Sequence, residues 1–281
     1  MTARNTPGST AAADDESIKR GYASVNGLEM YYEIHGTGQP LVLLHGAFSA
    51  IGTSFAKVLP ALARTRQVIG VELQAHGRTA DIDRPLRCEF MADDVAALLR
   101  SLNIEEADLF GYSTGAAVAL QVAIRHPEVV RKLVAVSVTY NTEGFHPGLM
   151  EGMEGLKPEH LAGSPWQLEY AAIAPNPGDW TALVEKVKDL RRQVQDWPAD
   201  DIRSIKAPTL FMVGDSDIIR PEHTVELFRL LGGGVPGDSM GLPDSQLAVL
   251  PGTTHATIMD RADWLVSMIE AFLAKPMPGG K

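Results

Sequence analysis

The stretch Gly111-Tyr112-Ser113-Thr114-Gly115 decides the fold of this chain, because it places a serine between two glycines where the sequence pattern changes. An apolar dipeptide precedes the stretch, and a helix-forming run over residues 116–124 follows it. That context predicts a serine presented on a sharp turn between a strand and a helix. Such a turn strains the backbone at the serine, so the positions two before and two after it have to be small to let strand and helix pass closely.

A serine hydroxyl is a weak nucleophile at neutral pH, so chemistry at this serine requires a histidine to take its proton and an acid to orient that histidine. The chain offers both in order. An apolar run over residues 209–213 predicts a strand that is followed by Asp215 and Asp217. A second run, over residues 246–250, is followed by a loop that carries His255. Loops after the strands of an open parallel sheet converge on one crevice, so we expect these groups to meet the serine there.

The remaining histidines fit structural roles better than the role of a base. His45 and His76 belong to turns that we interpret as structural. The other five stand in polar or terminal contexts that are typical of surface residues: His35, His126, His146, His160 and His223. For the acid, the residues alone leave Asp215 and Asp217 as alternatives.

A serine that attacks a carbonyl also needs hydrogen-bond donors for the oxyanion that forms. The apolar run Leu41–Leu44 predicts a further strand, and it ends in a glycine turn whose next residues are Ala47 and Phe48. We expect the backbone N–H groups of Ala47 and Thr114 to be the two donors. Because these are main-chain groups, the side chains at the two positions affect only the shape of the site.

Five motifs together resemble those of the α/β-hydrolase superfamily: His45-Gly46, Gln74-Ala75-His76-Gly77-Arg78-Thr79, Gly111-x-Ser113-x-Gly115, Gly214-x-x-Asp217 and Gly252-x-x-His255. The resemblance covers the chain from about Gly21 to Leu273. Within the superfamily the chain resembles the esterases, lactonases, cofactor-free haloperoxidases and carbon–carbon-bond hydrolases that keep a serine nucleophile. The spacing in the family favours Asp217 over Asp215 as the acid.

Two positions depart from the usual pattern of the superfamily. Gln74-Ala75 stands where the loop usually reads Arg-Gly before the His-Gly pair, and Ala116 stands where a further glycine is usual. Neither position takes a direct part in the chemistry that the resemblance implies. The departures therefore bear on the range of substrates more than on activity.

The order of apolar runs predicts an α/β fold with a mostly parallel eight-stranded sheet, an N-terminal hairpin and helices on both faces, and the resemblance implies that this is the α/β-hydrolase fold. The hairpin is expected to turn at Asn26-Gly27, between strands at Tyr22–Ser24 and Leu28–His35. Further strands are expected at Leu41–Leu44, Val68–Val71, Leu109–Tyr112, Leu133–Val138, Thr209–Val213 and Gln246–Leu250. Helices are expected around Ser54–Leu62, Met91–Leu102, Gly115–Arg125, Pro221–Leu231 and Ala262–Leu273.

The composition and the spacing of the apolar runs divide the chain into three parts. Residues 1–17 are polar and lack an apolar core, so they read as a disordered tail. Residues 18–138 and 203–275 form the expected α/β-hydrolase core. Residues 139–202 separate two consecutive strands by more than a crossover needs and carry several short apolar segments. We interpret this interval as a small helical cap inserted over the active site.

Composition narrows the class of protein independently. The net charge of −10 over 281 residues argues against a nucleic-acid partner or an anionic membrane surface. The single cysteine, Cys88, allows neither an intramolecular disulfide nor a thiolate metal cluster. No signal peptide and no membrane helix is recognisable, so a cytoplasmic location is expected.

These observations predict a cofactor-free serine hydrolase that uses no metal and splits a small, largely apolar carboxylic ester or lactone. Ser113 would attack, His255 would move the proton and Asp217 would orient the histidine. Side chains expected to contact this small-molecule substrate are Phe48, Tyr112, Tyr140, Met150, Trp166 and Tyr170. The alternatives are carbon–carbon-bond cleavage or perhydrolase and haloperoxidase chemistry with the same triad, or a ligand receptor derived from a hydrolase. A homo-oligomer is left open.

Overall fold

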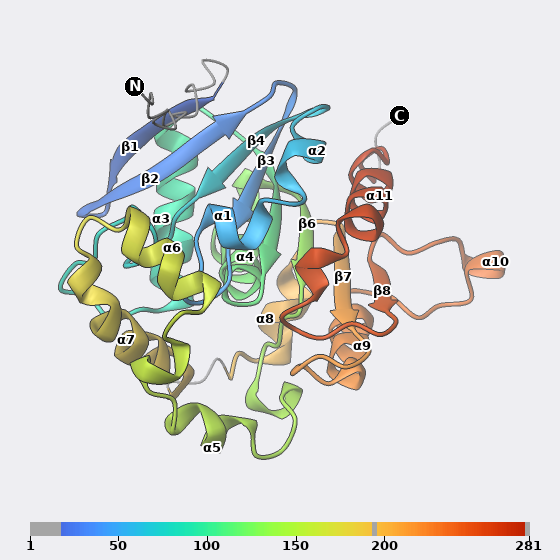
Figure 1. Cartoon of the computed structure of the whole chain (residues 1–281). Helices are drawn as coiled ribbons and strands as arrows, with labels where there is room; N and C mark the ends of the chain where they lie inside the picture. Colours follow the sequence, from blue (N-terminus) through green and yellow to red (C-terminus); the bar gives the residue numbers. More distant parts are fainter. Residues whose placement is uncertain (1–17, 193–195, 279–281) are drawn as a thin grey trace, which may run out of the picture.

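The computed structural model describes residues 18–192 and 196–278 and arranges its strands in one sheet (Figure 1). The strands are β1 (Lys19–Val25), β2 (Leu28–His35), β3 (Gln39–Leu44), β4 (Arg66–Val71), β5 (Ala107–Tyr112), β6 (Val130–Val136), β7 (Thr209–Gly214) and β8 (Gln246–Leu250). Their order across the eight-stranded sheet is β1-β2-β4-β3-β5-β6-β7-β8. The expected tail over residues 1–17 lies outside the described residues.

The sheet is antiparallel only at its N-terminal edge. β1 pairs with β2 and β2 with β4 in antiparallel fashion, while β3, β4, β5, β6, β7 and β8 pair in parallel. Asn26 and Gly27 join β1 to β2 with φ angles of 50° and 82°, which suits a two-residue hairpin turn. The mostly parallel eight-stranded sheet with an N-terminal hairpin is therefore confirmed.

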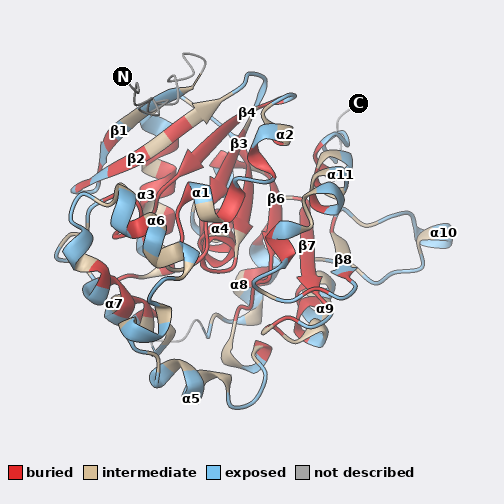
Figure 2. Cartoon of the chain, viewed as in Figure 1, coloured by how far each residue is buried: buried red, intermediate tan, exposed pale blue. Residues whose placement is uncertain are grey.

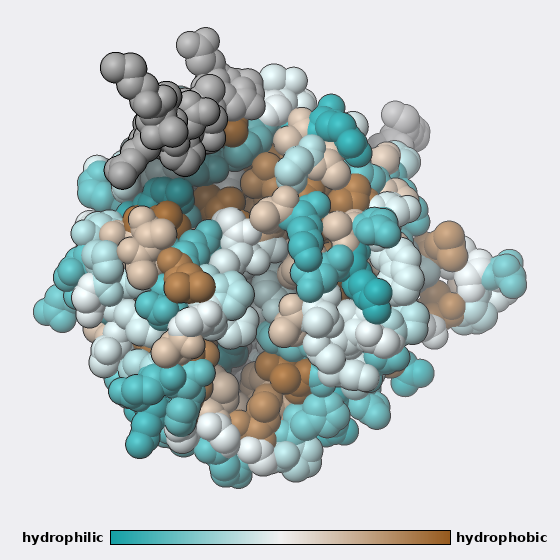
Figure 3. Space-filling view, in the orientation of Figure 1, coloured by the Kyte–Doolittle hydropathy of each residue, from teal (hydrophilic) through white to brown (hydrophobic). Residues whose placement is uncertain are grey.

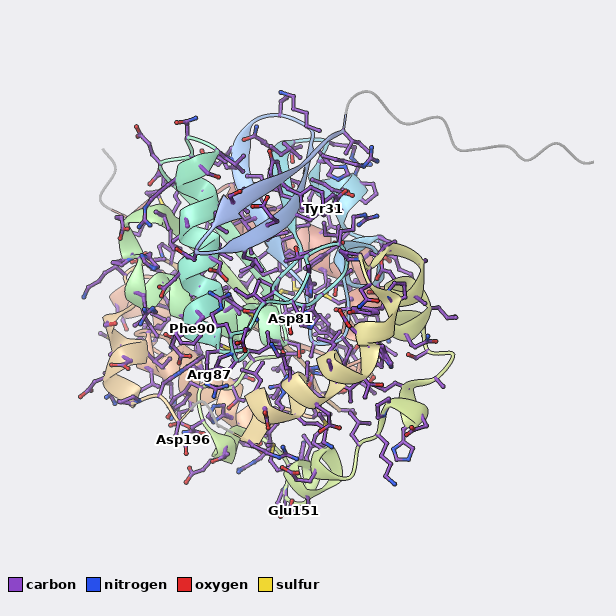
Figure 4. The ribbon with its side chains drawn as sticks, turned by 90° about the vertical axis from the view of Figure 1, so that its left-hand side faces the viewer. Tyr31, Asp81, Arg87, Phe90, Glu151 and Asp196 are labelled. Carbon is purple, nitrogen blue, oxygen red and sulfur yellow. The ribbon has the colours of Figure 1, made fainter. Side chains whose placement is uncertain are left out.

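Helices cover both faces of the sheet (Figure 2). On one face α3 (Cys88–Ser101) and α4 (Thr114–Arg125) pack in one apolar cluster, and α3 also lies against β1 (Figure 4). On the other face α1 (Ile51–Phe55), α2 (Leu59–Leu62) and α11 (Ala262–Leu273) pack in a second cluster. The remaining core elements are the 3-10 turns η1 (Pro127–Val129) and η5 (Ile258–Asp260), with the helices α9 (Pro221–Leu230) and α10 (Gly237–Met240).

Two expected elements differ from the structure in a way that sequence chemistry explains. The single helix expected around Ser54–Leu62 is two short helices, because Pro60 in the first turn of α2 has no N–H to continue a helix from α1. The strand expected to run to Val138 ends at Val136 instead. Ser137, with a φ of 55°, turns the chain away from the sheet.

The interval between β6 and β7 is helical. It contains η2 (Thr142–Gly144), α5 (Leu149–Glu154), η3 (Pro158–Leu161), α6 (Pro165–Ile173), η4 (Pro177–Asp179), α7 (Trp180–Arg192) and α8 (Ala199–Ser204), while residues 193–195 lie outside the described part. Figure 1 shows α5, α6 and α7 gathered on one side of the molecule. Mostly hydrophilic residues cover the outer surface of this side in Figure 3.

Specific contacts join this interval to the core. The Glu169 carboxylate on α6 accepts a hydrogen bond from the Thr53 backbone N–H at 3.0 Å. The Lys186 ammonium on α7 pairs with Asp81 at 2.5 Å, and Figure 4 labels Asp81 where the core meets these helices. The Trp180 ring lies 6.2 Å from the Phe48 ring, centroid to centroid. No helix within the described ranges combines the length and the apolar character that crossing a membrane requires.

The serine turn is tightly packed against its neighbours in the core. Ser113 has φ 54° and ψ −118°, a backbone conformation that residues other than glycine rarely adopt. A Cβ atom on Gly115 would lie 2.0 Å from the backbone oxygen of Leu44, and one on Gly111 would lie 2.4 Å from the Cα atom of Ala116. Both glycines are therefore required by the close approach of strand and helix, as the sequence pattern predicts.

The substitution Gly115→Ala should lower the free energy of unfolding by about 3 kcal/mol, because strand β3 and helix α4 would have to separate to accept the methyl group. Urea unfolding of purified protein measures this change. Gly152→Ala is the matched control, since a Cβ at that position of α5 meets no atom within 4 Å and alanine favours a helix. Equal stability of the two variants would contradict the packing argument.

Candidate active site

Ser113 lies at the start of α4, directly after β5, and is 8% exposed. Its backbone N–H donates to the carbonyl of Val136 at 2.9 Å, which fixes the turn to the end of β6. Its side-chain Oγ lies 2.9 Å from Nε2 of His255. The strained turn therefore presents the hydroxyl to the histidine expected from the sequence.

His255 and Asp217 complete a chain of hydrogen bonds. His255 lies in the loop after β8, and its Nδ1 lies 2.8 Å from Oδ1 of Asp217, which follows β7. When Nδ1–H donates to this carboxylate, Nε2 is left as the acceptor for the serine proton. The three residues that the sequence brought forward thus form one continuous Ser–His–Asp arrangement.

The Asp217 side chain is fully buried but stays ionised. Burial on its own raises the pKa of a carboxyl group, and it is the largest single influence here. Hydrogen bonds from His255, from the Ser137 hydroxyl at 2.6 Å and from the Ile219 backbone N–H at 3.1 Å outweigh it and hold the pKa of Asp217 below its usual range. A permanent negative charge therefore lies behind the imidazole.

Asp215, the alternative acid, has different hydrogen-bond partners from those of Asp217. Its carboxylate accepts hydrogen bonds from the backbone N–H groups of Gly252, at 2.9 Å, and Thr253, at 3.1 Å. These two hydrogen bonds lower the pKa of Asp215. The side chain ties the loop after β7 to the loop that carries His255, and it does not contact the histidine. Of the two acids, the structure brings only Asp217 to His255.

The expected oxyanion donors lie beside the serine. Leu44 and Gly111 are register partners on the adjacent strands β3 and β5, so the loops after these strands start side by side. Thr114 is the first residue of α4, and the N–H groups of a first helical turn have no acceptor within the helix. Ala47 follows Gly46, where a Cβ atom would lie 3.5 Å from the Cβ atom of Ser113. The two amides that we expect to bind the oxyanion therefore belong to turns that start side by side next to Ser113.

The space in front of the serine is narrow in this structure, about 10 Å³, which is room for a single water molecule. Its lining residues come from the core and from the interval between β6 and β7: Ser113, Ala117, Ser137, Val138, Thr139, Phe145, Arg191, Ile218, Ile219 and His255. A substrate larger than water therefore has to displace lining side chains.

Arg191 is the charged residue in this lining that the sequence reasoning missed. Its guanidinium on α7 donates to Oγ1 of Thr114 at 2.9 Å and lies 6.0 Å from the centre of the Phe145 ring. Burial lowers the pKa of Arg191, and within the described ranges no carboxylate forms an ion pair with it. A position near the end of an amphipathic helix resembles any surface arginine, so no signal in the sequence distinguished it.

None of the six side chains expected to contact the substrate lines this narrow space. Tyr112 instead donates its hydroxyl to the carbonyl of His255 at 2.8 Å, and Tyr170 packs on Trp180 with ring centroids 5.3 Å apart. Tyr140 is turned toward α9, where its ring stacks on His223. The other three are half-buried: Phe48, Met150 and Trp166.

One histidine outside the site is not in the surface environment that the sequence predicted. His223 is buried, not at the surface, because its ring stacks on Tyr140 and its Nε2 lies 2.9 Å from Oγ1 of Thr139. His45 and His76 are buried in turns, where burial lowers their pKa values to about 3 and about 4. His45 accepts the Leu73 backbone N–H at 3.0 Å through Nε2, so it has a structural role.

Cys88 is buried at the start of α3. Over residues 18–192 and 196–278, no three His, Cys, Asp or Glu side chains come together in a way that could hold a metal ion.

Comparison with known proteins agrees with this fold. A family model described as alpha/beta hydrolase fold matches residues 39–176. The chain is 28% identical over 278 residues to 2-hydroxy-6-oxo-2,4-heptadienoate hydrolase of Pseudomonas putida, covering 88% of this chain and 94% of that protein. It is 28% identical over 271 residues to pimeloyl-[acyl-carrier protein] methyl ester esterase of Aeromonas hydrophila, covering 86% of this chain and 98% of that protein.

Solved structures show the same fold. A serine hydrolase involved in carbazole degradation superposes with a TM-score of 0.74 at 20% identity, covering 92% of this chain and 99% of that one. Sheet order, family match and full-length relatives agree, and this chain belongs to the α/β-hydrolase superfamily.

A fluorophosphonate that reacts with base-activated serines should label Ser113 and no other residue, because among the residues that the structure describes only this hydroxyl lies against a histidine that is itself held by a buried carboxylate. Peptide mapping by mass spectrometry identifies the labelled residue. The variant Ser101→Ala, which removes a hydroxyl bonded only to the Leu98 carbonyl, is the control and should label normally. Label on a different serine would overturn the assignment of the reactive hydroxyl.

Proposed function

We propose that this protein is a serine hydrolase that cleaves a small carboxylic ester or lactone through an acyl-enzyme. The observation that carries the proposal is the continuous Ser113–His255–Asp217 arrangement, with contacts of 2.9 Å and 2.8 Å at the end of parallel strands. In Ser–His–Asp hydrolases these three groups activate the serine in this order of contact. Two curated relatives that align over most of this chain carry hydrolase and esterase names, which supports a hydrolytic reaction.

In the first half of the proposed reaction Ser113 Oγ attacks the substrate carbonyl while His255 Nε2 takes the hydroxyl proton. Asp217 holds the imidazole in the correct tautomer and stabilises its positive form. The Ala47 and Thr114 amides stabilise the oxyanion, and His255 then gives the proton to the leaving alcohol. Water attacks the acyl-enzyme by the same steps and releases the acid.

The lining of the site refines the substrate class. We expected a largely apolar substrate, but the Arg191 guanidinium faces the serine without a carboxylate partner in the described chain. A partly buried cation that lacks a counter-ion is costly, and an anionic group on a ligand removes that cost. We therefore propose that the substrate carries a carboxylate or another anionic group near its reacting carbonyl.

Residues 139–202 act in this proposal as a cap. They contribute Phe145 and Arg191 to the lining of the narrow space in front of Ser113. Entry of a substrate requires these side chains to move, because the space as it stands has room for one water molecule. A closed site of this kind keeps bulk water from the acyl-enzyme and selects compact substrates.

A second candidate is cleavage of a carbon–carbon bond beside a ketone with the same three residues. One observation favours it: the relative from Pseudomonas putida is named for 2-hydroxy-6-oxo-2,4-heptadienoate, a keto acid whose carboxylate is the kind of group that Arg191 could hold. The two candidates differ in the bond that breaks. Assaying the purified protein with carboxylate-bearing esters and with keto-dienoates separates them.

The substitution Asp217→Asn should reduce kcat for ester hydrolysis about 10⁴-fold, because an amide at this position favours the wrong tautomer of His255. Asp215→Asn is the matched control two residues away and should cost less than about tenfold, since Asp215 accepts hydrogen bonds from two backbone N–H groups and the Ser216 hydroxyl and does not contact His255. Steady-state kinetics of both variants with a p-nitrophenyl ester test this ranking. A larger loss for Asp215→Asn would reverse the assignment of the acid.

The substitution Arg191→Gln should raise KM for an ester that carries a carboxylate by about tenfold or more, because a charge-assisted hydrogen bond to the anion is lost. Its effect on a neutral ester of equal size should stay within about threefold. Arg192→Gln is the control, because that neighbouring guanidinium is exposed and pairs with Glu154. Equal effects on charged and neutral esters would refute the anionic substrate and leave the serine mechanism intact.

A further inference from the structure

The Ser137 hydroxyl lies behind the site, at a position that no sequence motif indicates. Ser137 follows β6 with a φ of 55°, and its backbone N–H donates to the Met212 carbonyl at 2.8 Å. This contact ties the end of β6 to β7, the strand that leads to Asp217. The residue is 2% exposed, and its Oγ donates to Oδ2 of Asp217 at 2.6 Å.

The donors on Asp217 are divided unequally between its two oxygens. Oδ1 faces His255 Nδ1 at 2.8 Å and accepts the Ile219 backbone N–H at 3.1 Å. Within the described chain, Oδ2 accepts a hydrogen bond from Ser137 alone. A carboxylate without solvent contact needs donors on both oxygens to stay ionised and to keep its plane fixed. Ser137 is therefore the group that holds the side of the carboxylate turned away from the histidine.

We propose that Ser137 is a positioning residue for the hydrolytic reaction, acting through Asp217 by holding its carboxylate ionised and oriented toward His255. The inference rests on the proposed function, since it concerns the efficiency of the same Ser–His–Asp arrangement. Ser137 does not transfer a proton in the reaction, because its hydroxyl proton points at a carboxylate that stays charged throughout.

Loss of this donor should shift the pH dependence of activity in a predictable direction. Without the Ser137 hydroxyl, one of the hydrogen bonds that lower the pKa of Asp217 is lost, so this pKa rises and the carboxylate takes up a proton at higher pH than before. A carboxylate with one donor fewer also attracts the imidazolium proton more strongly, so the base becomes available only at higher pH. Both effects move the acid limb of kcat/KM in the same direction, to higher pH.

The charged and titratable groups around Asp217 come from three other elements. His255 lies in the loop after β8, and Tyr112 lies at the end of β5, where burial raises its pKa and the charge of Asp217 adds to the rise. Arg191 of α7 lines the same narrow space as Ser137. All three are unchanged by a substitution at Ser137, so they leave the direction of the shift unaltered.

The substitution Ser137→Gly tests the proposal without added backbone strain, because glycine accepts a φ of 55° readily. The loss of one buried hydrogen bond should lower the unfolding temperature by only a few degrees, so the variant stays folded. We expect kcat for a small p-nitrophenyl ester to fall about tenfold, KM to stay within about twofold and the acid limb of kcat/KM to move up by about one pH unit. Ser137→Ala, which keeps the strained backbone, should show the same kinetic changes.

Two further variants complete the experiment. Ser245→Ala removes a serine that is equally buried but lies at the start of β8, and it should leave the pH profile unchanged. Ser113→Ala tests the proposed function itself. If Ser113→Ala abolishes hydrolysis while Ser137→Gly keeps the wild-type kcat and pH profile, the positioning role is overturned and the serine mechanism stands. If Ser113→Ala retains hydrolysis, the proposed function is overturned.

Discussion

The close approach of helix α4 to the end of strand β3 is the constraint on which the rest of the structure depends. Gly115 places its Cα against the Leu44 carbonyl, where even a methyl group would overlap. The chain between β5 and α4 has no room for a relaxed turn, so Ser113 takes a strained backbone conformation. That strain has a geometric result, because it lifts the serine hydroxyl out of the sheet toward the loops that follow β7 and β8.

Two carboxylates two residues apart show how the environment separates structural and chemical roles. Asp215 remains at the surface and holds the histidine loop in place through backbone N–H groups. Asp217 is buried, and it keeps its charge only because the imidazole, one hydroxyl and one amide all donate to it. Burial strengthens the interaction of this charge with His255, since the surrounding dielectric is low. The same burial makes each donor more important, which is why the position of Ser137 has consequences at the serine.

Chemistry and selectivity come from different parts of the chain. Strands β3, β5, β7 and β8 position the reacting groups, and their geometry follows from the sheet. The interval between β6 and β7 adds Phe145 and Arg191, whose positions follow from how short helices dock on the core. On the proposed function, a change of substrate needs changes only in this interval. The serine, histidine and aspartate can remain as they are.

The sequence by itself determined the sheet, the serine turn and the chain order of serine, acid and histidine, because these depend on local patterns: apolar runs of strand length, glycines at fixed spacing and polar residues just after each strand. It left the choice between Asp215 and Asp217 to the resemblance, and none of the six side chains that it assigned to substrate contact lines the narrow space in front of Ser113. Arg191, Ser137 and His223 acquire their surroundings only from residues distant in the chain, since Arg191 meets Thr114, Ser137 meets Asp217 and His223 meets Tyr140. Burial and pairing of this kind are properties of the packed fold, and for that reason only the tertiary structure decided which charges and hydroxyl groups face the serine.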